Sequence, residues 1–347
     1  MRCEKAHHVR LIFTSGGQDA AGEYFSGPLA LGHRRLSVID LSERASQPMV
    51  DSETGLVLVF NGTIYNYPEL REQLRGRGHR FVSSGDTEVI LRAYAEWGED
   101  CTTHLHGMFA FALWDARRQQ LFLARERFGL KSLYYSITPG CVRFASTSQA
   151  LLAGGEVDTS LDPVALHHHL TLHAVVPAPR TVLRGLRKLP PAHTMTFTPA
   201  GRKLLQRYWQ LDAADCSRDM SEWEWLDAVH TSLRRAVERR RTIADVPVGI
   251  LLSGGLDSSL LVALLADLAL LASAGNGSRQ TNGNGRGSLP EDEEYFDSWS
   301  DIFRFSRENL VVDRRRYEAM IYELGKLGAW QEFFKKQNRE NKGLRDK

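Results

Sequence analysis

The fold is decided by the stretch Ser253-Gly254-Gly255-Leu256-Asp257-Ser258-Ser259, which follows the apolar run Val246-Pro247-Val248-Gly249-Ile250-Leu251-Leu252. We predict a buried strand over 246–252, a tight glycine turn and a helix over 257–272. A strand, a glycine turn and a helix in this order aim backbone N–H groups and the positive helix end at one point, which is a geometry that binds phosphate. The glycines let the backbone approach a ligand closely. The loop has no lysine at the Walker position, so it is not that type of phosphate loop.

Length and composition are typical of a globular protein with more than one domain. The chain has 347 residues, of which 42% are hydrophobic and 25% charged. A net charge of +2 gives no reason to expect nucleic acid or a membrane surface as a partner. No apolar run is long enough to cross a bilayer, and we identify no signal peptide. The scattered cysteines suit a reducing compartment, so we expect a cytoplasmic protein; they are Cys3, Cys101, Cys141 and Cys216.

Residues 1–205 have the pattern of an α+β domain. We predict buried strands over 56–60, 108–114 and 120–125, the last two forming a hairpin. Apolar residues at helical spacing predict helices over 67–78 and 86–97.

Residues 206–273 have a different pattern, which predicts the start of an α/β nucleotide-binding domain. A capping box of Ser221 and Glu224 begins a helix, and the strand and helix around the glycine turn follow it. Residues 274–294 are rich in glycine, asparagine and serine, so we expect a disordered linker. Residues 295–347 have the spacing of short amphipathic helices, a tail unrelated to the domains before it.

Asn61-Gly62 follows the predicted strand 56–60 and is a candidate oxyanion hole. An asparagine amide and a glycine N–H at a strand end can both donate to a tetrahedral oxyanion. Taken alone, the same dipeptide is typical of a turn. The run His167-His168-His169 is a weaker candidate for chemistry, because adjacent histidines on a helix point in different directions. We therefore expect no metal site there.

Four further motifs give the candidate oxyanion hole a context. They are Gly32-His33-Arg34-Arg35-Leu36-Ser37-Val38-Ile39-Asp40, Ser84-Gly85-Asp86-Thr87-Glu88-Val89-Ile90, Gly107-Met108-Phe109-Ala110-Phe111-Ala112 and Arg125-Glu126-Arg127-Phe128-Gly129-Leu130-Lys131. Together they resemble the glutamine-hydrolysing asparagine synthetases from about residue 17 to 268. The segments 65–71 and 173–180 are most similar to the N-acetylglutaminylglutamine amidotransferase branch. The resemblance implies an αββα glutaminase domain of the N-terminal-nucleophile type, followed by an ATP-pyrophosphatase domain.

The resemblance also implies roles for individual residues. Arg35 would hold the carboxylate of bound glutamine and Asp86 its α-ammonium group, with backbone groups of Leu36 and Val38 lining the pocket. Asn61 and Gly62 would form the oxyanion hole. Taken singly, Arg35 would be interpreted as part of a surface ion pair and Asp86 as a helix N-cap. The ligands of ATP and pyrophosphate would be Leu252, Ser253, Gly254, Gly255, Asp257 and Ser258.

The two ends of the chain depart from the family pattern. The family's nucleophile is a cysteine directly after the initiator methionine, where its own α-amine acts as the base. This chain begins Met1-Arg2-Cys3-Glu4, so Cys3 is the candidate nucleophile, and we expect Arg2 to block methionine removal. The match ends near residue 270, so we expect a synthetase domain truncated there.

The function expected from the resemblance is a glutamine-dependent and ATP-dependent amidotransferase. Glutamine is hydrolysed in the first domain, and the ammonia attacks a carboxylate adenylated in the second. The partners would be L-glutamine, ATP with Mg²⁺ and an acceptor carboxylate on aspartate or a small peptide, in a possible homodimer. The alternative is an inactive or truncated paralogue that binds glutamine or a partner chain without turnover.

Overall fold

The computed structural model describes residues 8–11, 13–14, 19–212, 220–251 and 255–275. The chain divides into two units. The first is Met1–Met220 together with Thr242–Pro247, and the second is Ser221–Arg241 together with Val248–Lys347. No helix among the described residues combines the length and the apolar character that crossing a membrane requires.

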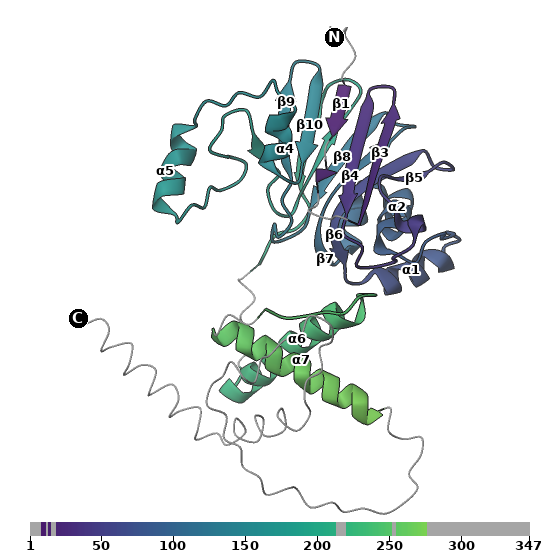
Figure 1. The fold of residues 1–347 in the computed structure, drawn as a ribbon, viewed down its shortest axis with the longest axis vertical. Helices are drawn as coiled ribbons and strands as arrows, with labels where there is room; N and C mark the ends of the chain where they lie inside the picture. The colour runs from purple at the N-terminus through teal and green to yellow at the C-terminus, as the bar shows by residue number, and fades with distance from the viewer. Residues whose placement is uncertain (1–7, 12, 15–18, 213–219, 252–254, 276–347) are drawn as a thin grey trace, which may run out of the picture. The chain divides into compact units, whose positions relative to one another are not determined.

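Two β-sheets form the centre of the first unit (Figure 1). One sheet is antiparallel, and its order is β13 (Lys203–Arg207), β12 (His193–Phe197), β8 (Gln120–Arg125), β7 (Gly107–Asp115), β6 (Leu56–Ile64) and β5 (Met49–Asp51). The other is mixed, and its order is β11 (Arg187–Lys188), β9 (Tyr134–Thr138), β10 (Cys141–Ala145), β1 (His8–Leu11), β4 (Leu29–Arg35) and β2 (Phe13–Thr14), with β3 (Ala20–Ser26) pairing β4. Strand β1 runs parallel to both β10 and β4.

Helices cover the outer faces of both sheets. Figure 1 shows α1 (Tyr67–Gly76) and α2 (Asp86–Trp97) beside β6. Helix α4 (Ser148–Ala153) packs its Leu151 against the mixed sheet. The remaining helical segments are η1 (Glu43–Ala45), η2 (Gly98–Asp100), α3 (Cys101–His104) and α5 (Pro163–Thr171).

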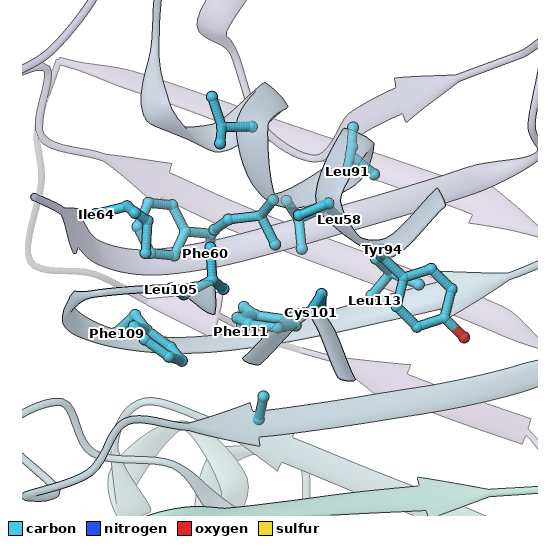
Figure 2. Packing of buried hydrophobic residues seen from close by; sticks show 14 of the residues in the cluster. Leu58, Phe60, Ile64, Leu91, Tyr94, Cys101, Leu105, Phe109, Phe111 and Leu113 are labelled. Carbon is cyan, nitrogen blue, oxygen red and sulfur yellow. The ribbon is translucent and has the colours of Figure 1, made fainter. Parts of the chain in front are cut away.

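Side chains alternate between two cores along the central strands. In β7, Phe109 and Phe111 pack toward α1 and α2, whereas Ala110 and Ala112 pack toward the mixed sheet. Figure 2 shows the first of these cores, in which Phe109 and Phe111 lie near Phe60 of β6. A strand buried on both faces needs no polar alternation, which explains its continuous apolar sequence. The layers are therefore helix, sheet, sheet and helix, as the resemblance implies.

The predicted strands and helices of the first unit are confirmed, with one change at Asn61-Gly62. The strand predicted over 56–60 continues to Ile64, so this dipeptide is inside β6 and forms no turn. Its partners in β7 are Ala110 and Phe109. The reason is steric: a Cβ on Gly62 would lie 2.0 Å from the Met108 carbonyl oxygen, so the glycine permits a close strand pair.

The second unit contains α6 (Glu222–Thr242) and α7 (Leu256–Gly275). The capping box is confirmed, because the Ser221 N–H donates to Glu224 Oε2 at 2.7 Å and the Glu224 N–H to Ser221 Oγ at 3.4 Å. The helix predicted over 257–272 is α7, which takes in the first two residues of the predicted linker 274–294. The rest of that linker and the predicted tail 295–347 lie outside the described residues.

The prediction of a strand over 246–252 is wrong for residues 246–251, which are the part of it that the structure describes. Residues 246–251 have no strand geometry, and Leu251 is 96% exposed. A strand needs a hydrogen-bonded neighbour, and within the described ranges no strand pairs with this segment. Its first two residues, Val246 and Pro247, belong instead to the first unit.

Candidate functional site

The residues predicted to bind glutamine come from three places in the first unit. Arg35 ends β4, Asn61 and Gly62 lie in β6, and Asp86 begins α2. The loop after Arg35 carries Leu36 and Val38. Asp86 is tied directly to β6, because its Oδ2 accepts a hydrogen bond from the Ile64 N–H at 3.0 Å. The fold thus brings the start of α2 to the part of β6 that holds the candidate oxyanion hole.

The free edge of β6 organises this site. Strand β5 pairs with β6 only as far as Leu58. Beyond that point side chains replace the missing strand: Gln47 Oε1 accepts the Phe60 N–H at 2.6 Å, and His33 Nε2 lies 3.0 Å from the Phe60 carbonyl oxygen. Asp86 accepts the N–H of Ile64 at the same edge.

The Gly62 N–H lies between these two capped positions. In a regular antiparallel pair every second residue directs its N–H away from the partner strand. The β6–β7 register runs without a bulge from Leu56 to Ile64, so Gly62 shares the orientation of Phe60 and Ile64. Its N–H therefore points out from the β6 edge, flanked by groups that fix the backbone on both sides. An N–H that is free to donate at a strand edge is a candidate oxyanion donor.

Asp86 is a buried carboxyl group in the first turn of a helix. Burial raises its pKa to about 6, although backbone hydrogen bonds from Ile64 and Thr87 and the charge of Arg35 act in the opposite direction. Gly85 occupies the N-cap position, so the N-cap interpretation of Asp86 is wrong. A buried carboxylate with a raised pKa is a suitable partner for an ammonium group, whose charge would offset the cost of burial.

Arg35 is buried and holds the loop that follows it. Its guanidinium donates to the carbonyl oxygens of Ile39 at 2.8 Å, Ser42 at 3.3 Å and Asp40. It is 8% exposed, so the interpretation as part of a surface ion pair is also wrong. A guanidinium has five N–H donors, and these three bonds leave others for a ligand carboxylate.

Asp40 is a residue of the candidate site that the sequence reasoning missed. Its Oδ2 accepts the N–H of Ser84 at 2.7 Å and of Gly85 at 3.2 Å, and its Oδ1 accepts the N–H of Ser42 at 3.0 Å. Burial acts to raise the pKa of Asp40, but hydrogen bonds from the Ser42 hydroxyl and from the N–H groups of Ser84 and Ser42 outweigh it and lower the pKa to about 2. Asp40 thereby joins the loop after β4 to the start of α2. The available signal was the sequence Asp-Leu-Ser, which is typical of an Asx turn.

Arg71 and Glu88 fix the loop before α2 from its other side. Arg71, in α1, donates to the carbonyl oxygens of Ser83 and Gly85, each at 2.5 Å. Glu88 accepts the N–H of Ser83 at 2.7 Å. The approach to Asp86 is therefore held rigidly before any ligand binds, which is the preorganisation that selective binding needs.

The candidate phosphate loop is described only in part. Leu252, Ser253 and Gly254 lie outside the described residues, as does Cys3. Asp257 is in the first turn of α7, and the Ser258 hydroxyl donates to the Gly255 carbonyl at 3.0 Å. Among the described residues no group of His, Cys, Asp or Glu side chains could hold a metal ion.

Comparison with known proteins identifies the family of the chain. The model of the glutamine amidotransferase domain matches residues 3–209, and the asparagine synthase model matches residues 228–281. The fold is that of an N-terminal-nucleophile amidotransferase, and the chain belongs to the glutamine amidotransferase domain family.

Individual relatives are longer than this chain. "Asparagine synthetase [glutamine-hydrolyzing] 3" of Bacillus subtilis is 36% identical over 72% of this chain and 40% of its own length. Amidase chyE of Penicillium rubens is 38% identical over 73% of this chain and 37% of its own. The chain thus spans about two fifths of the relatives' length. Among solved structures, the glutamine phosphoribosylpyrophosphate amidotransferase of B. subtilis covers 69% of this chain and 50% of its own, with 17% identity and a TM-score of 0.37.

Proposed function

We propose that the first unit binds L-glutamine at the β6 edge and hydrolyses its side-chain amide. The observation that carries this proposal is the outward Gly62 N–H, held between Phe60 and Ile64 by side-chain caps. The α-ammonium of glutamine pairs with Asp86 and its carboxylate with Arg35. The amide then lies against Asn61 and Gly62, where the side-chain amide of Asn61 and the backbone N–H of Gly62 stabilise the oxyanion of the tetrahedral intermediate.

The thiol of Cys3 is the candidate nucleophile of this reaction. It attacks the amide carbon, ammonia leaves, and water releases glutamate from the thioester. Leu36 and Val38 line the pocket with backbone groups.

The ammonia is used, in this proposal, by an ATP-dependent second step. The loop 252–258 binds the pyrophosphate portion of ATP with Mg²⁺, a carboxylate is adenylated with release of pyrophosphate, and ammonia displaces AMP to form the amide. The match of residues 228–281 to the asparagine synthase model supports this assignment. The proposed acceptor is aspartate or the carboxylate of a small peptide, and the proposed setting is the cytoplasm, in a homodimer.

A substitution of Asn61 tests the glutaminase assignment. Removing one oxyanion donor lowers kcat by about 10²–10³-fold in enzymes of known mechanism. We expect Asn61→Ala to lower kcat for ammonia release from glutamine to this extent, with little change in KM. Gln149→Ala, on the surface of α4, is the matched control and should leave both constants unchanged. Equal kcat values for Asn61→Ala and the unaltered chain would contradict the assignment.

A thermal-shift measurement with glutamine separates this function from the non-enzymatic alternative. Stabilisation by glutamine together with ammonia release supports the proposed enzyme. Stabilisation without release supports a glutamine-binding paralogue, and the absence of both overturns the glutamine site.

A further inference from the structure

One short segment of the chain is assigned to the first unit although both of its neighbours in sequence belong to the second. Residues Thr242–Pro247 follow α6 and precede the segment that leads to α7. The Asp245 N–H donates to the Val38 carbonyl oxygen at 2.9 Å. In return, Asp245 Oδ2 accepts the Asp40 N–H at 2.7 Å. A residue far along the chain thus makes reciprocal bonds to the loop that lines the proposed glutamine pocket.

We propose that Asp245 is a positioning residue for glutamine binding, an inference that rests on the proposed function. Asp245 contacts the proposed pocket at Val38, but its hydrogen bonds do not reach Arg35 or Asp86, which are assigned to the charged groups of glutamine. It acts through Asp40, whose N–H it accepts, and through Val38, whose carbonyl it caps.

Asp40 connects this loop to both proposed ligands of the charged groups of glutamine, Arg35 and Asp86. Its carbonyl oxygen accepts from Arg35, the proposed ligand of the glutamine carboxylate. Its side chain accepts from Ser84 and Gly85, directly before Asp86, the proposed ligand of the α-ammonium. The distance between the two charged ligands therefore depends on where Asp40 is held.

The backbone of Asp40 needs external support to stay in place. Its φ is +51°, in the left-handed region, which aspartate enters more readily than most residues but still at a cost in free energy. Such a conformation persists only when surrounding contacts over-determine it. The carboxylate of Asp245 supplies one of these contacts as a charge-assisted hydrogen bond to the residue's own N–H.

The negative charge of Asp245 also acts on Tyr67, at the start of α1. Burial is the largest cause of the raised pKa of Tyr67, and the charges of Asp245 and Asp86 add to it. The charge of Asp40 acts on Tyr67 in the same direction, whereas that of Arg71 acts in the opposite one. Asparagine at position 245 retains the acceptor and removes the charge, so it separates the two contributions.

The test measures glutamine affinity calorimetrically on the full chain. We expect Asp245→Ala to weaken binding by roughly ten-fold or more, because it leaves the Asp40 N–H without its partner. Asp245→Asn should stay within about three-fold of the unaltered chain, since the acceptor is retained. Asp227→Ala, on exposed α6, is the matched control and should bind as the unaltered chain does. Where turnover is measured, Asp245→Ala should raise KM and leave kcat within about two-fold. Equal affinity of Asp245→Ala and the unaltered chain overturns the inference.

Amide hydrogen exchange provides a readout that does not require glutamine. Loss of the bond from Asp40 should speed exchange of residues 36–42 and 83–86 in Asp245→Ala, and Asp245→Asn should restore slow exchange. If the unaltered chain binds no glutamine, the proposed function fails, while the exchange comparison still decides whether Asp245 holds the loop. Unchanged exchange in a folded Asp245→Ala variant overturns the inference even where glutamine binds.

Discussion

Gly62 combines two structural demands that other residues cannot meet. Its φ is +148°, outside the range common for side chains, and a Cβ would lie 2.0 Å from the Met108 carbonyl oxygen. Both demands come from the close approach of β6 and β7, the same approach that sets the direction of its N–H. The requirement for glycine is therefore structural as well as chemical.

Substitution of Gly62 is predicted to destabilise the protein strongly. We expect Gly62→Ala to cost about 3 kcal/mol or more, since a backbone clash and an unfavourable φ act together. Gly76, at the end of α1, has open space at its Cβ position and serves as the control. Gly76→Ala should be neutral or stabilising by up to about 1 kcal/mol. Urea unfolding of the two variants gives the comparison, and similar midpoints would contradict the prediction.

Glutamine binding is predicted to depend on pH through Asp86. Its pKa of about 6 in the free protein means that its carboxyl group is largely protonated at pH 5 and ionised at pH 7. Only the ionised form pairs with an ammonium group, so affinity should rise roughly ten-fold from pH 5 to pH 7. Calorimetry at three pH values checks this. Asp86→Asn should bind weakly, with a flat pH profile; a rise as steep as in the unaltered chain would contradict the assignment.

Asp86 and His33 are predicted to have opposite effects on stability over one pH range. The raised pKa of Asp86 means that the folded state binds the extra proton, so its contribution to the free energy of unfolding falls as pH rises from about 4 to about 6. Burial lowers the pKa of His33 to about 4, so its contribution increases from pH 4 toward 6.5. Asp86→Asn should therefore show a steeper increase in stability with pH than the unaltered chain. Unfolding at pH 4.5 and 6.5 measures the difference.

At the scale of elements, a buried ionic contact fixes α2 to the antiparallel sheet. Arg92 of α2 lies 2.6 Å from Asp51 of β5 and 3.2 Å from Glu88, and all three side chains are largely buried. Removing Arg92 would leave the buried carboxylates of Asp51 and Glu88 without this cationic partner. We expect Arg92→Ala to cost about 3–5 kcal/mol in unfolding free energy.

The control for this prediction is an exposed pair on α1. Arg75 lies 2.7 Å from Glu72, and both side chains are at least half exposed. Arg75→Ala should cost no more than about 1 kcal/mol. Equal losses for the two arginines in chemical unfolding would show that burial does not decide the effect.

The sequence predicted those elements whose pattern is local. Helix α2 and the hairpin of β7 and β8 follow from spacing and apolar runs, and the capping box predicted the start of α6. Asn61-Gly62 could not be assigned to a strand or a turn from its own residues, because its partners Ala110 and Phe109 are distant in sequence. The segment 246–252 had the composition of a buried strand, but a strand depends on neighbours that its own sequence does not contain.

The residues of the candidate site also divide into those with a local sequence pattern and those that depend on distant partners. Arg35, Asn61, Gly62 and Asp86 could be found through motifs. Asp40 and Asp245 could not be assigned a role in this way, because what they do depends on hydrogen bonds between distant loops. A side chain that only accepts hydrogen bonds from the backbone of a distant loop belongs to no motif that a single sequence can reveal.

At the scale of the whole molecule, the two units are predicted to respond separately to glutamine. We expect scanning calorimetry to resolve two transitions, of which glutamine moves only that of the first unit. A ligand at 100 times its Kd stabilises the form that binds it by about 2.7 kcal/mol. D-Glutamine, which cannot place its charged groups on Arg35 and Asp86 in the same pose, should have a smaller effect. A shift confined to the second unit would contradict the location of the site.

The assignment of Thr242–Pro247 to the first unit also has a consequence for synthesis on the ribosome. Domains generally fold as units during translation, the N-terminal one first. Here the loop at Val38 and Asp40 cannot acquire its Asp245 partner until α6 has been translated. The region that carries the proposed glutamine pocket therefore emerges with this loop unsupported. Under the proposed function, the nascent chain would bind glutamine weakly until α6 and the segment after it have been translated.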